Sequence, residues 1–175
     1  LGLEDVKESR TTKALVNHAK KANTAPKRFL REVKADELMN LNVGDLVKVD
    51  IFSAGDIVDV TGTSKGKGYM GTIVRNNAHQ GPRSHGGSKN IRHIGSLATT
   101  GRNNGRIEKG TMMAGHEGVY TTTNQNLEVI KVDAEKNYML IKGNVPGPKR
   151  GLVLVKTTVK RTKQVPAKVL LGQEA

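Results

Sequence analysis

Runs of β-branched and aliphatic residues predict a mainly β chain. Residues 46–51 and 56–60 are two such runs separated by a short Gly-containing loop, a pattern typical of a hairpin. A second hairpin is predicted from residues 126–132 and 138–142, and a further strand from residues 152–156. Because apolar residues occupy both faces of these later strands, the pattern favours a small barrel whose outer wall is also covered.

The first forty residues mix helical and extended patterns. Residues 11–22 place aliphatic side chains on one side and lysines on the other, which predicts a short helix that ends at the loop 23–26. Residues 28–33 are expected to form a short strand, and residues 35–41 either a helical turn or a loop.

The middle of the chain, residues 62–118, has no periodic apolar face. It holds 13 of the 20 Gly residues, and its apolar residues occur as isolated pairs. A segment this rich in Gly cannot repay its ordering entropy by burying its own side chains, so a partner must hold it. A disordered basic linker is the alternative, although short β-branched runs and His residues are interleaved with the charges.

Charge identifies the kind of partner. Residues 60–107 contain eight Lys or Arg, three His and no Asp or Glu. The net charge of +13 therefore divides into zero before this stretch, +8 within it and +5 after it. Together with a pI of about 10.1, this distribution indicates a phosphate backbone as the partner. An anionic membrane surface is the weaker alternative, because no basic amphipathic helix with bulky apolar anchors is present.

Composition excludes several other classes. Five aromatic residues and no Trp leave few stacking platforms, so splayed single-stranded bases are not expected as the main target. The absence of Cys excludes a disulfide framework and a thiolate zinc site, and the irregular spacing of the His residues predicts no metal. No run approaches the length of a membrane span and no signal sequence is expected, which favours a cytoplasmic protein.

Two motifs raise the possibility of an enzyme, and both lack a mechanism. Residues 66–71 match G-x-G-x-x-G after a strand, but no helix is expected to follow and no acidic residue stands about twenty positions on. Ser84, His85 and Ser88 have no carboxylate nearby to orient a His base. We therefore expect no catalytic residue, no cofactor and no small-molecule substrate.

Five segments resemble the bacterial form of the ribosomal large-subunit protein number three family. They read VDVTGTSKGKGYMGTIVR (58–75), RSHGGSK (83–89), IGS (94–96), KGTMMAGHEG (109–118) and QNLEVIKVDAEKNYMLIKGNVPGPKRGLVLVK (125–156). The resemblance implies a six-stranded β-barrel of the translation-protein type. It also implies a long loop extension that enters large-subunit ribosomal RNA, with its tip approaching the peptidyl transferase centre.

Carried onto this chain, the resemblance divides it into four parts. Residues 1–61 would form the first part of the barrel with a short helix and loop insertion, and residues 62–118 the basic extension. Residues 119–159 would complete the barrel, and residues 160–175 form a basic tail that is either flexible or laid on RNA.

Two sets of residues are expected to act in binding. The side chains expected to contact RNA are Lys65, Lys67, Arg75, His79, Arg83, His85, Lys89, Arg92, His93, Arg102, Arg106, Lys109, Lys149 and Arg150. The tip expected near the peptidyl transferase centre comprises Gly95, Ser96, Leu97, Ala98, Thr99, Thr100, Gly101, Arg102, Asn103, Asn104 and Gly105.

The chain departs from the family pattern in four places. It lacks the usual first strand with its G-x-K-x-G-M-T motif, so an incomplete barrel is expected. The tip lacks the Gln that some members methylate, and Glu108 stands where an aromatic residue is common. Thr122 and Asn124 replace apolar strand residues, which weakens the prediction of a strand at residues 119–124.

These observations together predict a structural, non-enzymatic constituent of the large ribosomal subunit. It would bind large-subunit ribosomal RNA, contact neighbouring ribosomal proteins and support subunit assembly in the cytoplasm. A free, translation-factor-like RNA chaperone is the alternative, because a basic surface alone also suits a protein that exchanges between RNAs.

Overall fold

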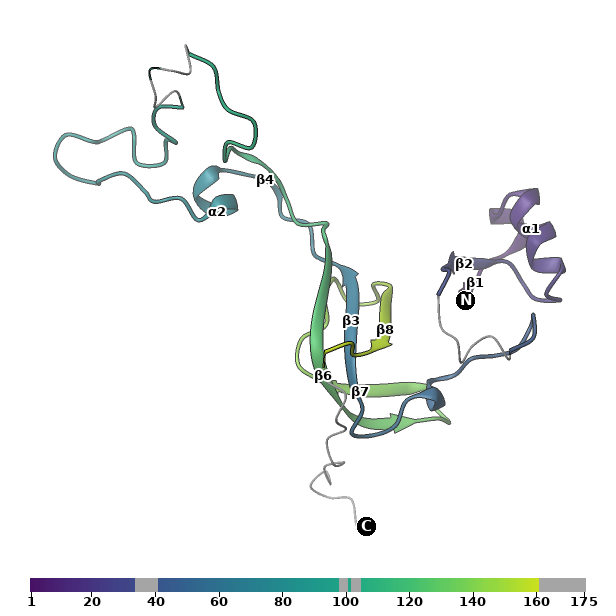
Figure 1. Ribbon diagram of the computed structural model, residues 1–175. Coiled ribbons are helices and arrows are strands. Elements are labelled where there is room, and N and C mark those ends of the chain that lie inside the picture. Colours follow the sequence, from purple (N-terminus) through teal and green to yellow (C-terminus); the bar gives the residue numbers. More distant parts are fainter. Residues whose placement is uncertain (34–40, 98–100, 102–104, 161–175) are drawn as a thin grey trace. The chain divides into compact units, whose positions relative to one another are not determined.

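The computed structural model describes residues 1–33, 41–97, 101 and 105–160. The chain separates into two compact units, Leu1–Ile51 and Phe52–Ala175 (Figure 1). Among the described residues, antiparallel strands are the main regular secondary structure, as the hydrophobic pattern predicts. In this part of the chain, no helix is both long and apolar enough to cross a membrane.

The first unit contains a two-stranded sheet and a helix. Strand β1 (Gly2–Asp5) pairs antiparallel with β2 (Lys27–Leu30), and between them lie the 3₁₀ turn η1 (Glu8–Arg10) and helix α1 (Lys13–Lys20). The predicted helix is confirmed. The predicted strand at residues 28–33 is confirmed only as far as Leu30, and β1 escaped prediction because its sequence, GLED, has no strand pattern. Two charged pairs cross this sheet, Lys27 with Asp5 and Arg28 with Glu4, beside the apolar pair of Leu3 and Phe29.

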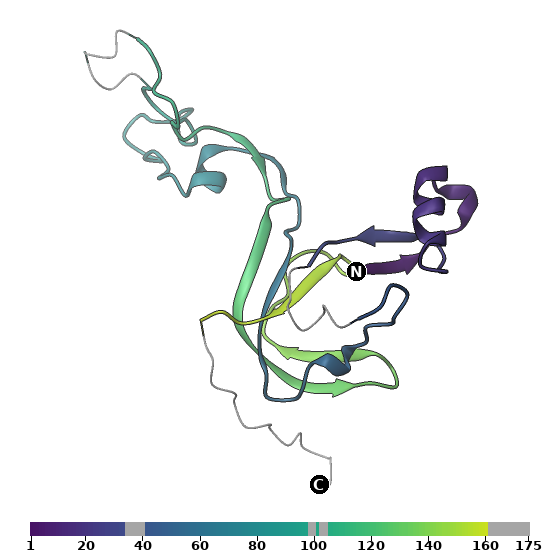
Figure 2. The same cartoon turned by 45° about the vertical axis from the view of Figure 1, so that its right-hand side comes forward.

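The second unit is built on a four-stranded antiparallel sheet in the order β7-β6-β3-β8. Its strands are β3 (Ile57–Thr63), β6 (Thr121–Asp133), β7 (Tyr138–Lys142) and β8 (Val153–Thr157). Both views show β6 running beside β3 (Figures 1 and 2). The predicted second hairpin corresponds to β6 and β7, and the predicted last strand to β8, so both are confirmed.

The core of this sheet is small. Val58, Val60 and Val129 are almost completely buried, and they are surrounded by partly buried side chains that include Phe52 and Leu127. Strand β3 is buried on both faces, as expected for the centre of the sheet. In β7, by contrast, exposed and half-buried residues alternate, so the expectation that both faces of the later strands are covered is wrong there.

The predicted first hairpin is wrong. Residues 46–51 contain no strand, and their last three form the 3₁₀ turn η3 (Val49–Ile51). Strand β3 instead pairs with β6 along one edge and with β8 along the other, so neither edge is left for a hairpin partner. Leu46 in the displaced run is 82% exposed, which shows that its apolar side chain found no place in the sheet.

The six-stranded barrel is not confirmed. The largest sheet among the described residues has four strands, and β7 and β8 lie at its two edges without pairing with each other. A barrel closes only when its edge strands pair. The architecture that the structure establishes is therefore mainly β, with open antiparallel sheets.

Polar cross-strand contacts explain why β6 begins as early as Thr121. The hydroxyls of Thr61 and Thr123 lie 2.8 Å apart across the β3–β6 pair. The Asn124 side-chain amide donates to the carbonyl of Asn144 at 2.7 Å. These hydrogen bonds stabilise a strand segment whose polar residues argued against it.

Candidate nucleic-acid interface

The basic extension, residues 62–118, leaves the sheet as a two-stranded ribbon. The Ser64 N–H donates to the Tyr120 carbonyl and the Lys67 N–H to the Glu117 carbonyl, each at 2.8 Å. Beyond them, β4 (Gly68–Met70) pairs antiparallel with β5 (Gly115–Glu117). The outgoing and returning arms are thus held together by backbone hydrogen bonds rather than by an apolar core.

Gly118 allows the two arms to approach each other. Its φ of +85° lies in the left-handed region, and a Cβ at this position would overlap the carbonyl oxygen of Lys65. Any side chain here would therefore combine backbone strain with a backbone clash.

A short helix follows the ribbon and joins the arms again. Helix α2 (Thr72–Asn76) begins directly after Gly71, so the expectation that no helix follows the G-x-G-x-x-G stretch is wrong. Five residues are too few to show a helical hydrophobic period in the sequence. The Arg75 guanidinium and the Asn76 amide both donate to the Met113 carbonyl, at 2.9 and 3.1 Å, and so tie α2 to the returning arm.

The helix does not revive the nucleotide-binding interpretation of the G-x-G-x-x-G stretch. That interpretation also needs an acidic residue about twenty positions further on, and residues 60–107 contain none. The glycines serve the ribbon instead: Gly68, the first residue of β4, has a φ of +71°, and Gly71 is the N-cap of α2.

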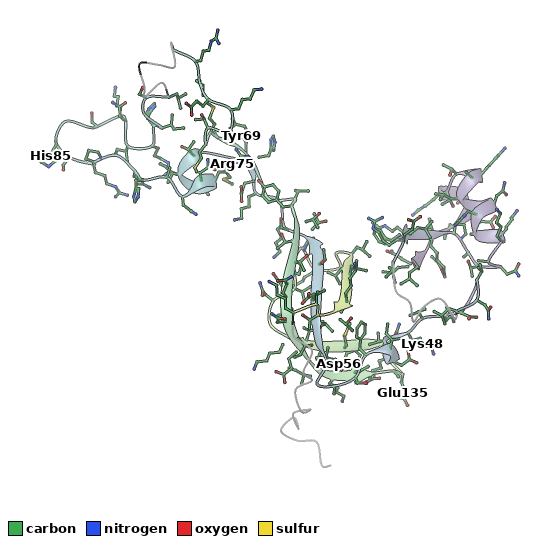
Figure 3. The ribbon with its side chains drawn as sticks, viewed as in Figure 1. Lys48, Asp56, Tyr69, Arg75, His85 and Glu135 are labelled. Atoms are coloured by element: carbon green, nitrogen blue, oxygen red, sulfur yellow. The ribbon has the colours of Figure 1, made fainter. Side chains whose placement is uncertain are left out.

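The loop after α2 is closed on itself. The Gly81 N–H donates to the Ile91 carbonyl at 2.9 Å, and His85 and Gly86 turn the chain with positive φ angles between these two ends. Figure 3 shows His85 at the outer bend of this loop. The closure presents Arg83, His85 and Lys89 on exposed positions, where their side chains can reach a polyanion.

All the predicted RNA-contacting side chains that the structure describes are exposed. They are Lys65, Lys67, Arg75, His79, Arg83, His85, Lys89, Arg92, His93, Arg106, Lys109, Lys149 and Arg150. Arg102 lies outside the described residues. Exposed cations on long side chains are suited to phosphate contacts, which position a protein on a nucleic acid.

Lys149 and Arg150 lie outside the extension in sequence, but the structure brings their loop to its base. A Cβ at Gly147 would lie 2.5 Å from the Thr63 carbonyl oxygen, and one at Gly62 would lie 2.9 Å from the Pro146 carbonyl oxygen. These close backbone contacts seat the loop before β8 against the end of β3, where the extension begins. The basic surface therefore continues past the limits of the extension.

The predicted tip is described only in part. Gly95, Ser96, Gly101 and Gly105 are exposed and Leu97 is half-buried. The other predicted tip residues, Ala98, Thr99, Thr100, Arg102, Asn103 and Asn104, lie outside the described residues.

Sequence reasoning missed a shallow cavity in the extension. Its volume is about 380 Å³, and its lining comes from three segments of the chain: Tyr69, Gly71 and Thr72; Arg92, His93, Ile94 and Leu97; and Met113 and Ala114. The Tyr69 ring meets the His116 ring edge to face, with centroids 5.6 Å apart. The only signal in the sequence was Tyr69 itself, the single aromatic residue between Gly62 and Gly118.

The described histidines do not gather into a metal site. Over residues 1–33, 41–97, 101 and 105–160, no three or more His, Cys, Asp or Glu side chains are grouped so that they could hold a metal ion.

Comparisons with known proteins agree with the resemblance in the sequence. The family model described as Ribosomal protein L3 matches residues 33–137. The chain is 52% identical to the large ribosomal subunit protein uL3 of Geobacillus stearothermophilus over 160 residues, covering 91% of this chain and 74% of the relative. It is 51% identical to the protein of the same name from Ligilactobacillus salivarius, covering 91% of this chain and 75% of the relative. Both the family model and these relatives extend across the ribbon and α2, and the chain belongs to the ribosomal protein L3 family.

Proposed function

We propose that this chain is a structural, non-enzymatic constituent of the large ribosomal subunit whose basic extension binds large-subunit ribosomal RNA. The observation that carries the proposal is the segregation of charge onto a ribbon. Residues 60–107 contain no carboxylate, and every predicted RNA-contacting side chain that the structure describes there is exposed. The relatives, at about half identity, are named as large-subunit proteins.

The construction of the ribbon suits entry into packed RNA. A carboxylate there would be an uncompensated like charge among phosphates, whereas small residues allow the backbone to approach closely. Backbone pairing in β4 and β5, with Arg75 and Asn76 on the Met113 carbonyl, holds the arms together without a bulky core. The base of the extension is therefore a narrow, paired ribbon that carries the basic loops beyond α2.

Three finer statements belong to the same proposal. The four-stranded sheet supplies four of the six strands of a translation-protein-type barrel on the subunit surface. The tip at residues 95–105 reaches toward the peptidyl transferase centre and supports its geometry. Neighbouring large-subunit proteins contact the chain within the cytoplasmic ribosome, where it assists subunit assembly.

Co-sedimentation tests the proposal. A tagged form of the chain, expressed in a bacterium, should remain with large subunits through a high-salt wash at one copy per subunit. A variant with Lys65, Lys67, Arg83 and Lys89 changed to Gln should be lost from them. As a matched control, the same change at four exposed lysines of the first unit, Lys7, Lys13, Lys20 and Lys21, should leave retention unchanged.

The competing function makes a different prediction in this experiment. A free RNA chaperone would dissociate in the wash and would bind unrelated RNAs as tightly as large-subunit RNA. We would therefore conclude that the chain is a chaperone if it is recovered at less than one copy per subunit and binds unrelated RNAs as tightly as large-subunit RNA.

A further inference from the structure

The shallow cavity of the extension combines three kinds of chemistry. Ile94, Leu97, Met113 and Ala114 contribute an apolar surface, and Tyr69 contributes an aromatic ring. Arg92 and His93, both exposed, contribute cationic and hydrogen-bonding groups from the same segment as Ile94. An apolar slot with one aromatic wall and one basic wall matches a nucleotide, whose base is flat and apolar on its faces and whose phosphate is anionic.

We propose that this cavity holds one unstacked nucleotide of the bound RNA, with its base against Tyr69 and Met113 and its phosphate toward Arg92 and His93. This inference rests on the proposed RNA-binding function and names the chemistry of one contact within it. A single pocket of this kind is compatible with few aromatic residues in the chain, because it needs one ring rather than a row of them.

The exposure of Tyr69 supports a ligand at this position. The residue is 69% exposed, although an aromatic side chain gains more than most from burial. The edge-to-face contact with His116, its partner in the β4–β5 pair, orients the ring. An oriented, exposed ring beside a cavity is a platform on which a base can stack.

One side of the cavity is held in shape before any ligand arrives. Arg75 and Asn76 fix the Met113 carbonyl, and Thr72 of the lining is buried at the start of α2. Figure 3 shows Tyr69 and Arg75 on this same part of the extension. Because Tyr69 belongs to the β4–β5 pair and Thr72 to α2, this side of the cavity needs less ordering of side chains when a ligand binds.

Size and charge argue for a nucleotide rather than another ligand. About 380 Å³ is near the lower end of the range for small-molecule pockets, roughly 300 to 1,000 Å³, which suits one nucleotide and excludes a duplex. An RNA strand followed along the extension meets no carboxylate in residues 60–107, so its phosphates can approach the rim.

The test compares salt dependence between variants of the full chain, with transcribed large-subunit ribosomal RNA as the probe. Tyr69→Ala should weaken binding about five- to one-hundred-fold, the effect of losing one stacked base, and leave the slope of log affinity against log salt unchanged. Tyr69→Phe keeps the ring and should bind within about twofold of the native chain, as expected if stacking carries the effect. Lys67→Gln should instead reduce the slope by about 0.7 to 0.9, as for the loss of one phosphate contact.

A second variant separates occupancy of the cavity from the stability of the ribbon. Ala114→Leu adds bulk inside the cavity while keeping Tyr69, and it should weaken binding as Tyr69→Ala does. Met112→Leu is the matched control, since Met112 precedes Met113 but is 67% exposed and does not line the cavity. Ultraviolet cross-linking with mass spectrometry should place a nucleotide adduct on Tyr69, His93 or Met113.

The outcomes distinguish this inference from the proposed function. If the native chain shows no salt-dependent RNA binding, the proposed function fails and the pocket with it. If the native chain binds with its full salt slope but Ala114→Leu binds equally well, the cavity is empty in the complex and the inference is overturned. Loss of binding in Tyr69→Ala alone would assign the ring a purely structural role and would also overturn it.

Discussion

The carboxylate of Asp59 accepts a hydrogen bond of 2.9 Å from the backbone N–H of Asn126. This contact lies where the register between β3 and β6 shifts after Val58, and Asn126 has a φ of +58°. The Asn126 side chain in turn accepts from the Thr158 hydroxyl at 2.9 Å, which ties the end of β8 to the bulge. An acidic residue that is only 7% exposed thus satisfies a backbone amide that the sheet ladder leaves unpaired.

Replacing Asp59 should therefore destabilise the sheet. Asp59→Ala leaves the Asn126 N–H without its acceptor and should lower the free energy of unfolding by about 1 to 3 kcal/mol. Asp59→Asn keeps an acceptor oxygen and should lower the free energy of unfolding by less. Denaturant unfolding measures both, with Asp50→Ala, an exposed site in the first unit, as the control. Equal stability of the native chain and Asp59→Ala would show that the Asp59–Asn126 hydrogen bond does not stabilise the sheet.

The pKa of Asp133, at the end of β6, should lie below its usual value. The main cause is the hydrogen bond of 3.0 Å from the Lys136 backbone N–H. Desolvation opposes it and is the next largest effect, while the Lys136 charge and hydrogen bonds from Tyr138 and the Glu135 backbone lower the pKa further. Because the folded-state pKa is lowered, the carboxylate stabilises the turn above the unfolded-state pKa, and this contribution is lost as pH falls through the folded-state pKa. A carbon-detected NMR titration should show a low midpoint. Lys136→Gln keeps the amide donor and should retain most of the shift, so a full return to the usual value would contradict the assigned cause.

Binding of large-subunit RNA by the isolated chain should be strongly salt-dependent. If about half of the eight cations in residues 60–107 reach phosphate, the log-log slope should be roughly −3 to −4, from about 0.7 to 0.9 per contact. Titrations between low and moderate salt measure it. A slope near zero would mean that phosphate contacts do not carry the affinity.

Gly118 and Gly110 form a matched pair for testing the ribbon. Both have φ near +85°, but a Cβ at Gly118 would meet the Lys65 carbonyl, whereas Gly110 has no atom within 4 Å of that position. Gly110→Ala should lower the free energy of unfolding by about 1 to 2 kcal/mol, from backbone strain alone. Gly118→Ala should cost more and should speed amide exchange at Ser64 and Lys67, whose N–H groups pair the arms. Similar exchange in the two variants would show that the arms do not need their close approach.

The glycines of the tip should affect function differently from Arg106, the cation that follows the tip. Gly95 has a φ of +83°, so Gly95→Val adds strain and bulk at the tip; Gly101→Val adds bulk without a positive φ. Both should impair peptidyl transfer or alter sensitivity to drugs that bind the catalytic centre, with assembly nearly intact. Arg106→Ala removes one phosphate contact and should mainly slow assembly. If the glycine variants assemble poorly but the subunits that form carry out normal peptidyl transfer, the assignment of residues 95–105 to the peptidyl transferase centre is wrong.

The sequence by itself determined the features that depend on nearby residues and on composition. Helix α1 and the β6–β7 hairpin follow from local patterns, because their partners are close along the chain. The basic extension follows from where the carboxylates are absent, which needs no coordinates. The motif resemblance likewise pointed to the family that the comparisons identify.

Only the tertiary structure decided which distant segments meet. Strand β3 takes β6 and β8 as neighbours rather than the adjacent run at 46–51, because strand pairing is settled by long-range hydrogen bonding and shared burial. The sequence predicted only a phosphate contact for Arg75, yet its guanidinium also donates a hydrogen bond to the carbonyl of Met113, 38 residues away. Asp59 and the cavity beside Tyr69 escaped prediction for the same reason: each is made by segments whose proximity no local pattern encodes.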